Sequence, residues 1–199
     1  MDKNALKKFT YGMFLLSAQA DGKDNACIIN TAIQVASDPV RIAVVALKSN
    51  LTHDFIRSSG EFTISSITTS APFEIFKRFG MQSGRNADKF ADFAGVVRGE
   101  SGRYELAEHV NMVMDAKVLQ EIDLDDHTMF IAEVTAAKVF GEEPSCSYDY
   151  YQSNIKPKKQ EKKGWVCDVC GYVYEGDPLP ADFICPWCKH GAEDFSPLK

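Results

Sequence analysis

Apolar and polar residues alternate along much of the first 150 positions of the chain, with the two-residue period of β-strands. Between positions 112 and 118, Met, Ala and Val alternate with Asp and Lys, as in a strand with one solvated face. The run RIAVVAL at 41–47 is almost continuously apolar, which is typical of a strand covered on both faces. The segments expected to form strands are 10–18, 41–47, 61–67, 112–118 and 129–140.

Turn and helix signals separate these segments. The dipeptide Asp21-Gly22 follows the first of them and is a strong signal for a tight β-hairpin. Short helices are expected at 52–58, which Gly60 ends, and at 72–79, which starts at a proline and precedes a glycine. Many strands with few helices favour a closed or partly open barrel, so the fold class predicted here is mainly β.

The length of 199 residues fits one ordinary domain followed by a small one. We place the first domain at residues 1–155, a Lys-rich linker at 156–163 and the second domain at 164–199. The Tyr-rich segment before the linker is expected to pack on the barrel. A unit of about 36 residues buries little apolar surface, so the second domain is expected to need a metal ion to fold.

Two CxxC pairs dominate the second domain: Cys167 with Cys170, and Cys185 with Cys188. Four thiolates from two tight turns can close a tetrahedral cage around one zinc or iron ion. The 14 residues between the pairs are slightly fewer than the roughly 15 to 20 of zinc ribbons. Aromatic residues nearby would form an apolar jacket that limits water access and tunes a redox metal. They are Trp165, Tyr172, Tyr174, Phe183, Trp187 and Phe195. Iron is therefore favoured, with structural zinc as the alternative.

The sequences CDVCGY and LPADFICPWC around these cysteines resemble the two knuckles of a rubredoxin. The resemblance implies one iron ion held by four cysteines, which cycles between the ferric and ferrous forms. The sequence departs from the rubredoxin pattern in two ways: the loop between the pairs is short, and Lys189 stands where a glycine usually follows the second pair.

Four polar segments carry the candidate chemistry of the first domain, which has neither a GxGxxG nor a Walker sequence. The segment 25–39 could present polar groups to a flat heteroaromatic ring. The segment 48–53 joins a strand end to a helix N-terminus and suits an anion. The segments 83–90 and 126–128 add basic side chains and a histidine. Each also has a simpler interpretation as a helix cap, a solvated charge or a structural histidine.

Together, five sequences resemble the flavin reductase family with its FMN-binding split-barrel fold: TYGMF, NACIINTAIQVASDP, SSGEFTIS, FGMQSGRNADKF and DHTMFIAEV. The resemblance covers roughly residues 5–155. It implies a split barrel with short flanking helices and FMN held at the interface of a homodimer. Such a domain followed by a rubredoxin module is similar to the high-molecular-weight rubredoxins of anaerobic bacteria.

The same resemblance implies roles for individual residues. It places the isoalloxazine near Asn30, Thr31 and Gln34, although residues 28–31 read IINT where relatives have a TVSS-like stretch. It places His127 at the nicotinamide side. The phosphate would lie near Lys48, Ser49 and Thr52, and the residues close to flavin or nicotinamide would be Ser83, Gly84, Arg85 and Lys89.

Joining the two halves predicts an electron-transfer oxidoreductase. NAD(P)H delivers two electrons as hydride and an iron centre accepts one at a time, so FMN would mediate between them. By resemblance, the acceptor would be a flavodiiron protein that reduces O2 or NO. Two alternatives are a flavin reductase that releases reduced flavin and carries a zinc docking module, and a passive FMN and iron carrier without NADH activity.

Charge and hydropathy restrict the partners. The net charge of −6 argues against nucleic acid and against an anionic membrane surface. No stretch is long and apolar enough to cross a bilayer. Four metal-binding thiols require a reducing compartment, which predicts a cytoplasmic protein. Cys27 and Cys146 are expected to be ordinary buried or half-buried thiols.

Overall fold

The computed structural model describes residues 2, 5, 8–157 and 164–198. Contacts divide the chain into two compact units, Met1–Pro157 and Lys158–Lys199. The linker predicted for 156–163 lies outside the described residues from position 158 onward. Within the described ranges, no helix combines the length and the hydropathy that a membrane span requires.

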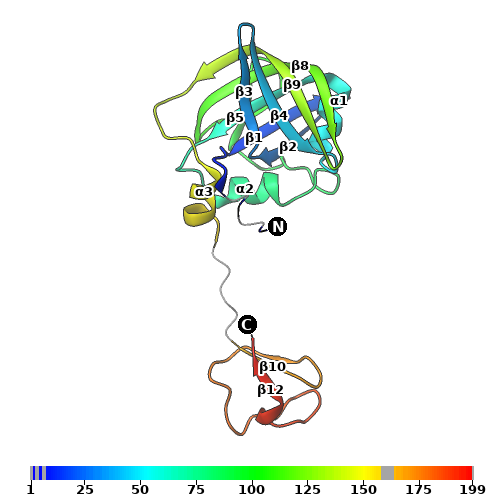
Figure 1. Ribbon diagram of the computed structural model, residues 1–199, viewed down its shortest axis with the longest axis vertical. Helices are drawn as coiled ribbons and strands as arrows, with labels where there is room; N and C mark the ends of the chain where they lie inside the picture. Colours follow the sequence, from blue (N-terminus) through cyan, green and yellow to red (C-terminus); the bar gives the residue numbers. More distant parts are fainter. Residues whose placement is uncertain (1, 3–4, 6–7, 158–163, 199) are drawn as a thin grey trace. The chain divides into compact units, whose positions relative to one another are not determined.

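The first unit is built on one antiparallel sheet, whose strong curvature is visible in Figure 1. Its strand order is β2-β1-β5-β8-β9-β4-β3. The strands are β1 Phe14–Ala20, β2 Lys23–Ile29, β3 Ala32–Ser37, β4 Val40–Leu47, β5 Glu61–Ile67, β8 Val110–Leu124 and β9 His127–Val139. A separate hairpin pairs β6 Val96–Arg98 with β7 Tyr104–Leu106. The mainly β prediction is confirmed.

One core cluster is enclosed by the curved sheet and includes Leu16, Val44, Phe62 and Phe130, all fully buried. Helix α1, Leu51–Ser59, contributes Ile56 to this cluster. The helix ends at Gly60, which adopts φ 72° and donates its backbone N–H to the Ile56 carbonyl. Glycine suits this left-handed position, so the sequence fixes where the helix ends.

A second core cluster joins helix α2, Phe73–Gly80, to the end of the first unit. There the short helix α3, Tyr148–Tyr150, runs into a π-helical turn, η2 Tyr151–Ile155. The Tyr151 ring is buried and packs on Phe76 with ring centroids 4.4 Å apart. The prediction that the Tyr-rich segment packs on the barrel is confirmed.

Several local predictions hold and one is wrong. Asp21 and Gly22 both adopt positive φ, 51° and 71°, and join β1 to β2 in the expected hairpin. Cys27 and Cys146 are buried as expected. The segment 25–39, expected to be polar ends of strands, instead forms most of β2 and all of β3. No residue of β3 is fully buried and most are exposed, so that strand has no buried face to produce an alternating pattern.

The second unit has very little regular structure. Its sheet orders β11, β10 and β12 and comprises Val173–Tyr174, Trp165–Cys167 and Phe195–Pro197. A 3-10 turn, η3 Ala192–Asp194, precedes β12. Two cysteines and one phenylalanine form its buried centre: Cys167, Cys185 and Phe195. So small a core supports the expectation that a metal ion is needed for folding.

Candidate metal centre and flavin site

The four cysteines of the second unit converge on one point. Their sulfur atoms all lie within 4.8 Å of one another. The Sγ atoms of Cys167 and Cys188 are 3.6 Å apart, and those of Cys170 and Cys185 are 3.5 Å apart. A tetrahedral ion with metal–sulfur bonds of roughly 2.3 Å gives sulfur–sulfur edges of about 3.8 Å. The cage therefore fits one iron or zinc ion.

The two knuckles repeat the same backbone turn. Gly171 donates its N–H to the Cys167 carbonyl at 2.8 Å, and Lys189 donates to the Cys185 carbonyl at 2.9 Å. Both residues have positive φ, 76° for Gly171 and 64° for Lys189. Lys189 thus adopts the glycine-like conformation that its position in the motif demands, at some cost in strain.

Backbone N–H groups and neighbouring sulfurs act on the thiols in opposite directions. Burial would raise the pKa of Cys185, but the N–H groups of Cys188 and Trp187 lower it to about 6. The His190 N–H lowers the pKa of Cys188, yet burial and the other three sulfurs together raise it to about 12. Four thiolates this close repel one another, so a cation is required to hold them all ionised.

Five of the six aromatic residues expected to form the jacket belong to the cluster around the buried sulfurs, and Trp187 does not. Tyr172, Phe183 and Phe195 pack around the buried sulfurs, and the Phe183 and Phe195 rings meet edge-to-face at 5.4 Å. The assignment of Trp187 to the jacket needs correction. Its side chain is 69% exposed and only touches Tyr172 edge-on at 5.4 Å, because the second knuckle turns it outward.

In the first unit, a cavity of about 490 Å³ lies where β2, β4 and β9 meet. It brings together three of the predicted site residues: Asn30, Thr31 and His127. Apolar side chains such as Ile28 and Leu124 complete the lining. The wall mixes apolar side chains with polar groups, so it offers both a surface for a flat heteroaromatic ring and hydrogen-bonding groups to orient it.

His127 opens β9 at the rim of this cavity. Its Nδ1 atom lies 2.7 Å from Asp126 Oδ1, and the side chain is 40% exposed. The hydrogen bond with His127 lowers the pKa of Asp126, whose carboxylate therefore stays ionised and orients the ring. Among the described residues, the other imidazole nitrogen of His127 has no hydrogen-bond partner.

The predicted phosphate segment lies at the N-terminus of α1. Asn50 occupies the cap position, but no side chain caps the helix. Lys48 pairs with Asp123 at 2.7 Å, and Ser49 is exposed beside it. Thr52 is fully buried and accepts a hydrogen bond from Asn25 at 2.8 Å, so its hydroxyl faces the core.

The loop 83–88 borders a second cavity, of about 520 Å³, on the other flank of the α1 N-terminus. Gly84 and Arg85 line it, together with Phe55 and Tyr104. A Cβ atom on Gly84 would lie 2.0 Å from Asn25 Oδ1, so only glycine fits this close approach. Ser83 is exposed, and its hydroxyl accepts the Arg85 backbone N–H within the loop.

Six of the predicted contacts line neither cavity: Gln34, Lys48, Ser49, Thr52, Ser83 and Lys89. Lys89 is only 4% exposed, and its ammonium group donates to the carbonyls of Ala26 and Phe79 at 2.9 and 3.1 Å. The loop turns the Lys89 side chain inward, so its ammonium group binds backbone carbonyls instead of a ligand. Gln34 is exposed on β3, where its amide bonds the Ala36 carbonyl. These hydrogen bonds do not favour Lys89 and Gln34 as cofactor contacts, and both assignments stay predictions.

Sequence reasoning missed residues that the fold adds to these cavities. Leu124 and Phe55 carry no motif, and they reach the cavities only through the pairing of β8 with β9 and the packing of α1. His53 and Asp54 were visible only as part of a helix start. Their contacts with Thr128 and Arg85 depend on residues more than 30 positions away, which local patterns do not reveal.

Comparison with known proteins agrees with this architecture. Residues 6–158 match the flavin reductase like domain, and residues 165–196 match the rubrerythrin, rubredoxin-like domain. The chain therefore belongs to the flavin reductase-like family and ends in a rubredoxin-like domain. The family resemblance predicted from the motifs is confirmed.

Individual relatives share one or both parts. The chain is 33% identical over 230 aligned residues to the high molecular weight rubredoxin of Moorella thermoacetica, covering 100% of both proteins. It is 34% identical over 160 residues to the ferric-chelate reductase (NAD(P)H) of Archaeoglobus fulgidus, covering 79% of this chain and 93% of that one. The flavoredoxin structure from Methanosarcina acetivorans shares the fold, with a TM-score of 0.59, 22% identity and coverage of 67% and 70%. The protein is thus an oxidoreductase that combines a flavin-binding fold with a rubredoxin-like site of four cysteines.

Proposed function

We propose that this protein takes hydride from NAD(P)H onto FMN and passes single electrons through an iron ion in the four-cysteine cage to a separate redox partner. The observation that carries the proposal is the presence, in one chain, of a flavin reductase-like unit and a cage of four converging thiols. When bound, FMN supplies exchange between two-electron and one-electron chemistry, and iron supplies one-electron transfer. Neither unit alone would connect NAD(P)H to a one-electron acceptor.

The residues of the chain have positioning roles in this proposal. Asn30, Thr31 and the apolar wall of the 490 Å³ cavity would hold the isoalloxazine, with water excluded. His127, oriented by Asp126, would contact the nicotinamide. The phosphate would bind at the start of α1, where Ser49 is exposed and Lys48 can exchange Asp123 for a stronger anion.

NAD(P)H as the donor is supported by the ferric-chelate reductase (NAD(P)H) relative, which the first unit resembles over nearly its whole length. The lack of a Rossmann sequence is compatible with this donor, because nicotinamide would stack on the flavin and need no separate dinucleotide fold. The acceptor we propose is a flavodiiron protein that reduces O2 or NO. The six acidic and two basic residues of 164–199 would favour a partner with a basic docking face.

A homodimer is part of the proposal. Exposed apolar side chains lie on β3, at the start of β4 and toward the C-terminal end of β8: Ile33, Val35, Val40, Leu119, Ile122 and Leu124. Leu124 also lines the 490 Å³ cavity, so a second copy seated on this surface would help to close that cavity. Analytical ultracentrifugation of the full-length protein measures its oligomeric state, and a monomer at micromolar concentration would contradict the proposed homodimer.

Anaerobic rapid mixing with NADH and with NADPH tests the electron path. In the wild-type protein, we expect the flavin absorbance to bleach first and the ferric absorbance to bleach second. In Cys167→Ser, NADH should still reduce the flavin, but electron delivery to the partner should collapse. Metal analysis is the second measurement, and stoichiometric zinc together with released reduced flavin would favour a flavin reductase with a docking module. Unchanged reduction of the partner by Cys167→Ser would refute the role of the iron.

A further inference from the structure

A continuous chain of hydrogen bonds links the start of β9 to the loop 83–88. The Nε2 atom of His53 lies 2.9 Å from Thr128 Oγ1. The Nδ1 atom of His53 lies 3.2 Å from Asp54 Oδ1, and Asp54 Oδ2 accepts from Arg85 Nη2 at 2.6 Å. The inner end is closed to water, since His53 is 4% and Thr128 5% exposed, whereas Asp54 and Arg85 are each 46% exposed along their side chains.

The ionisation of Asp54 determines which group donates and which accepts in each of these hydrogen bonds. Burial would raise the pKa of Asp54, but hydrogen bonds from Arg85 and His53 lower it, so its carboxylate is ionised and only accepts. His53 must therefore carry a hydrogen on Nδ1 to donate to Asp54. Its Nε2 atom is then an acceptor for the Thr128 hydroxyl in the neutral ring. Each oxygen of the Asp54 carboxylate is held by a different partner, so the plane of the carboxylate is fixed.

Arg85 has donors to spare for a ligand. A guanidinium group has five N–H donors, and the contact with Asp54 uses one of them. Arg85 lines the 520 Å³ cavity on the flank of α1, and Lys23 lines the same cavity. The cavity also reaches Leu51, the first residue of α1, so it adjoins the helix end at which the flavin phosphate is proposed to bind.

The exposed ion pair would be weak without its inner support. Ion pairs between half-exposed side chains contribute little to stability, because both partners lose rotamer freedom and water screens them. A carboxylate already locked by a buried donor loses less freedom when the arginine joins it. Hydrogen bonds from residues that do not touch the ligand hold binding side chains in a productive position in this way.

We propose that His53 is a positioning residue, which through Asp54 holds the Arg85 guanidinium in place for the phosphate of FMN. The proposal rests on the proposed function, because it takes the flavin site as given. It adds a buried histidine, one that needs no contact with flavin or nicotinamide, to the residues that determine how tightly the phosphate is bound. Arg85 is the residue that touches the ligand.

Two variants of His53 separate this role from a purely structural one. In His53→Asn, the side-chain amide lies near the position of Nδ1 and can still donate to Asp54, while the contact with Thr128 is lost. In His53→Gln, the amide reaches the position of Nε2 and keeps Thr128, while the contact with Asp54 is lost. We expect FMN to bind His53→Asn nearly as tightly as the wild type and His53→Gln about tenfold more weakly, as for the loss of one charge-assisted hydrogen bond.

The measurement is a titration of the flavin-depleted full-length protein with FMN and, in parallel, with riboflavin, which lacks the phosphate. His53→Gln should weaken FMN and leave riboflavin unchanged. The double variant His53→Gln/Arg85→Gln should bind FMN no more weakly than Arg85→Gln alone, because His53 acts through Arg85. Arg57→Gln is the matched control: it removes an exposed arginine of the same helix, paired with Glu121 at 3.0 Å, and should leave the affinity unchanged.

Three results would overturn the inference alone: FMN affinity retained in His53→Gln but lost in His53→Asn, equal weakening of FMN and riboflavin, or additive effects in the double variant. Thermal unfolding of each variant identifies a folding defect, and Asp54→Asn, altered at a half-exposed side chain, then takes the place of His53→Gln. A wild-type protein that binds neither FMN nor riboflavin would instead overturn the proposed function itself.

Discussion

The cage gathers its four cysteines from two short turns, whereas the proposed flavin site gathers its residues from β2, α1, the loop 83–88 and the start of β9. In the cage, each knuckle repeats one hydrogen bond between residues four apart, such as Lys189 to Cys185. Around the proposed flavin site, contacts such as His53 with Thr128 join residues 75 positions apart. A site made of local turns depends on its ion, and a site made of distant segments depends on the whole barrel.

The largest effect is expected from removing a ligand of the cage. Cys185→Ser replaces a fully buried thiol and leaves three ligands, so the unit of residues 164–198 should lose its metal and unfold. Calorimetry should then show the transition of the first unit unchanged and the transition of the second unit absent. A second unit that still unfolds cooperatively without metal would contradict the contrast between the two sites.

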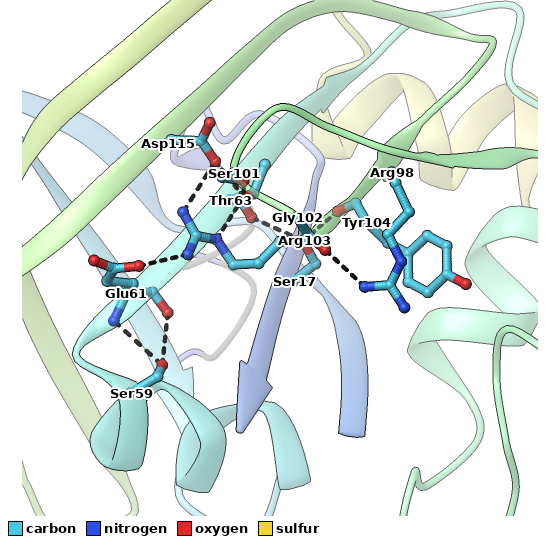
Figure 2. A network of polar contacts seen from close by, with 10 residues as sticks. All are labelled: Ser17, Ser59, Glu61, Thr63, Arg98, Ser101, Gly102, Arg103, Tyr104 and Asp115. Carbon is cyan, nitrogen blue, oxygen red and sulfur yellow. Dashed lines mark hydrogen bonds and ion pairs between the residues drawn. The ribbon is translucent and has the colours of Figure 1, made fainter. Parts of the chain in front are cut away.

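A buried arginine tests the dependence of the first unit on distant contacts. Arg103 pairs with Glu61 at 2.7 Å and with Asp115 at 3.2 Å, and it donates to Thr63 at 3.0 Å (Figure 2). Arg103→Met should destabilise the first unit by about 3 kcal/mol, because it leaves the mostly buried Asp115 carboxylate without its cation. Urea unfolding followed by circular dichroism measures this loss.

The control for that variant is Arg103→Met combined with Asp115→Leu, which removes the stranded charge as well. It should recover part of the lost stability. The visible spectrum of the metal cage should be the same in all three proteins. A spectrum that changes with Arg103 would show that the two units are not independent.

A pH-dependent effect is expected at Glu105, which is buried in the same region. Burial raises the pKa of Glu105 above its usual range, although Lys138 lowers it and the nearby acids Asp115 and Glu100 raise it further. The folded state therefore binds this proton more tightly than the unfolded state, and the associated stability is lost as the pH rises through the folded pKa. Glu105→Gln should stabilise the first unit at pH 7, and the gain should vanish near pH 4. Unfolding midpoints across that pH range check the sign.

The smallest effect is expected at Lys189. Its φ of 64° is unfavourable for a side chain with a Cβ atom, so Lys189→Gly should relieve strain in the second knuckle and stabilise the metal-loaded unit by about 1 kcal/mol at most. The equivalent change cannot be made at Gly171, which is already glycine, so Gly171→Lys is the matched reverse variant. Compared with the wild type, metal release to a chelator should be slower for Lys189→Gly and faster for Gly171→Lys.

The sequence indicates the cage more directly than the proposed flavin site, for a physical reason. The CxxC spacing determines both the turn and the direction of the thiols, so the two cysteine pairs can be located from the sequence alone. The ends of β4, β5 and α1 were also predictable, because Gly60 and the apolar run 41–47 mark them locally. For Lys89, nothing in SGRNADKF indicates that the side chain folds inward onto the Ala26 carbonyl. The whole of β3 was missed because its exposed face gives no alternation of buried and solvated residues.

The chain has two tryptophans, Trp165 and Trp187, and both belong to the second unit. Trp165 forms the first residue of β10, and Trp187 is largely exposed beside the ligand Cys188. Indole emission is consequently an intrinsic optical reporter of the rubredoxin-like unit alone. Its intensity and wavelength should follow metal loading and partner docking without any added label, while the first unit contributes only tyrosine.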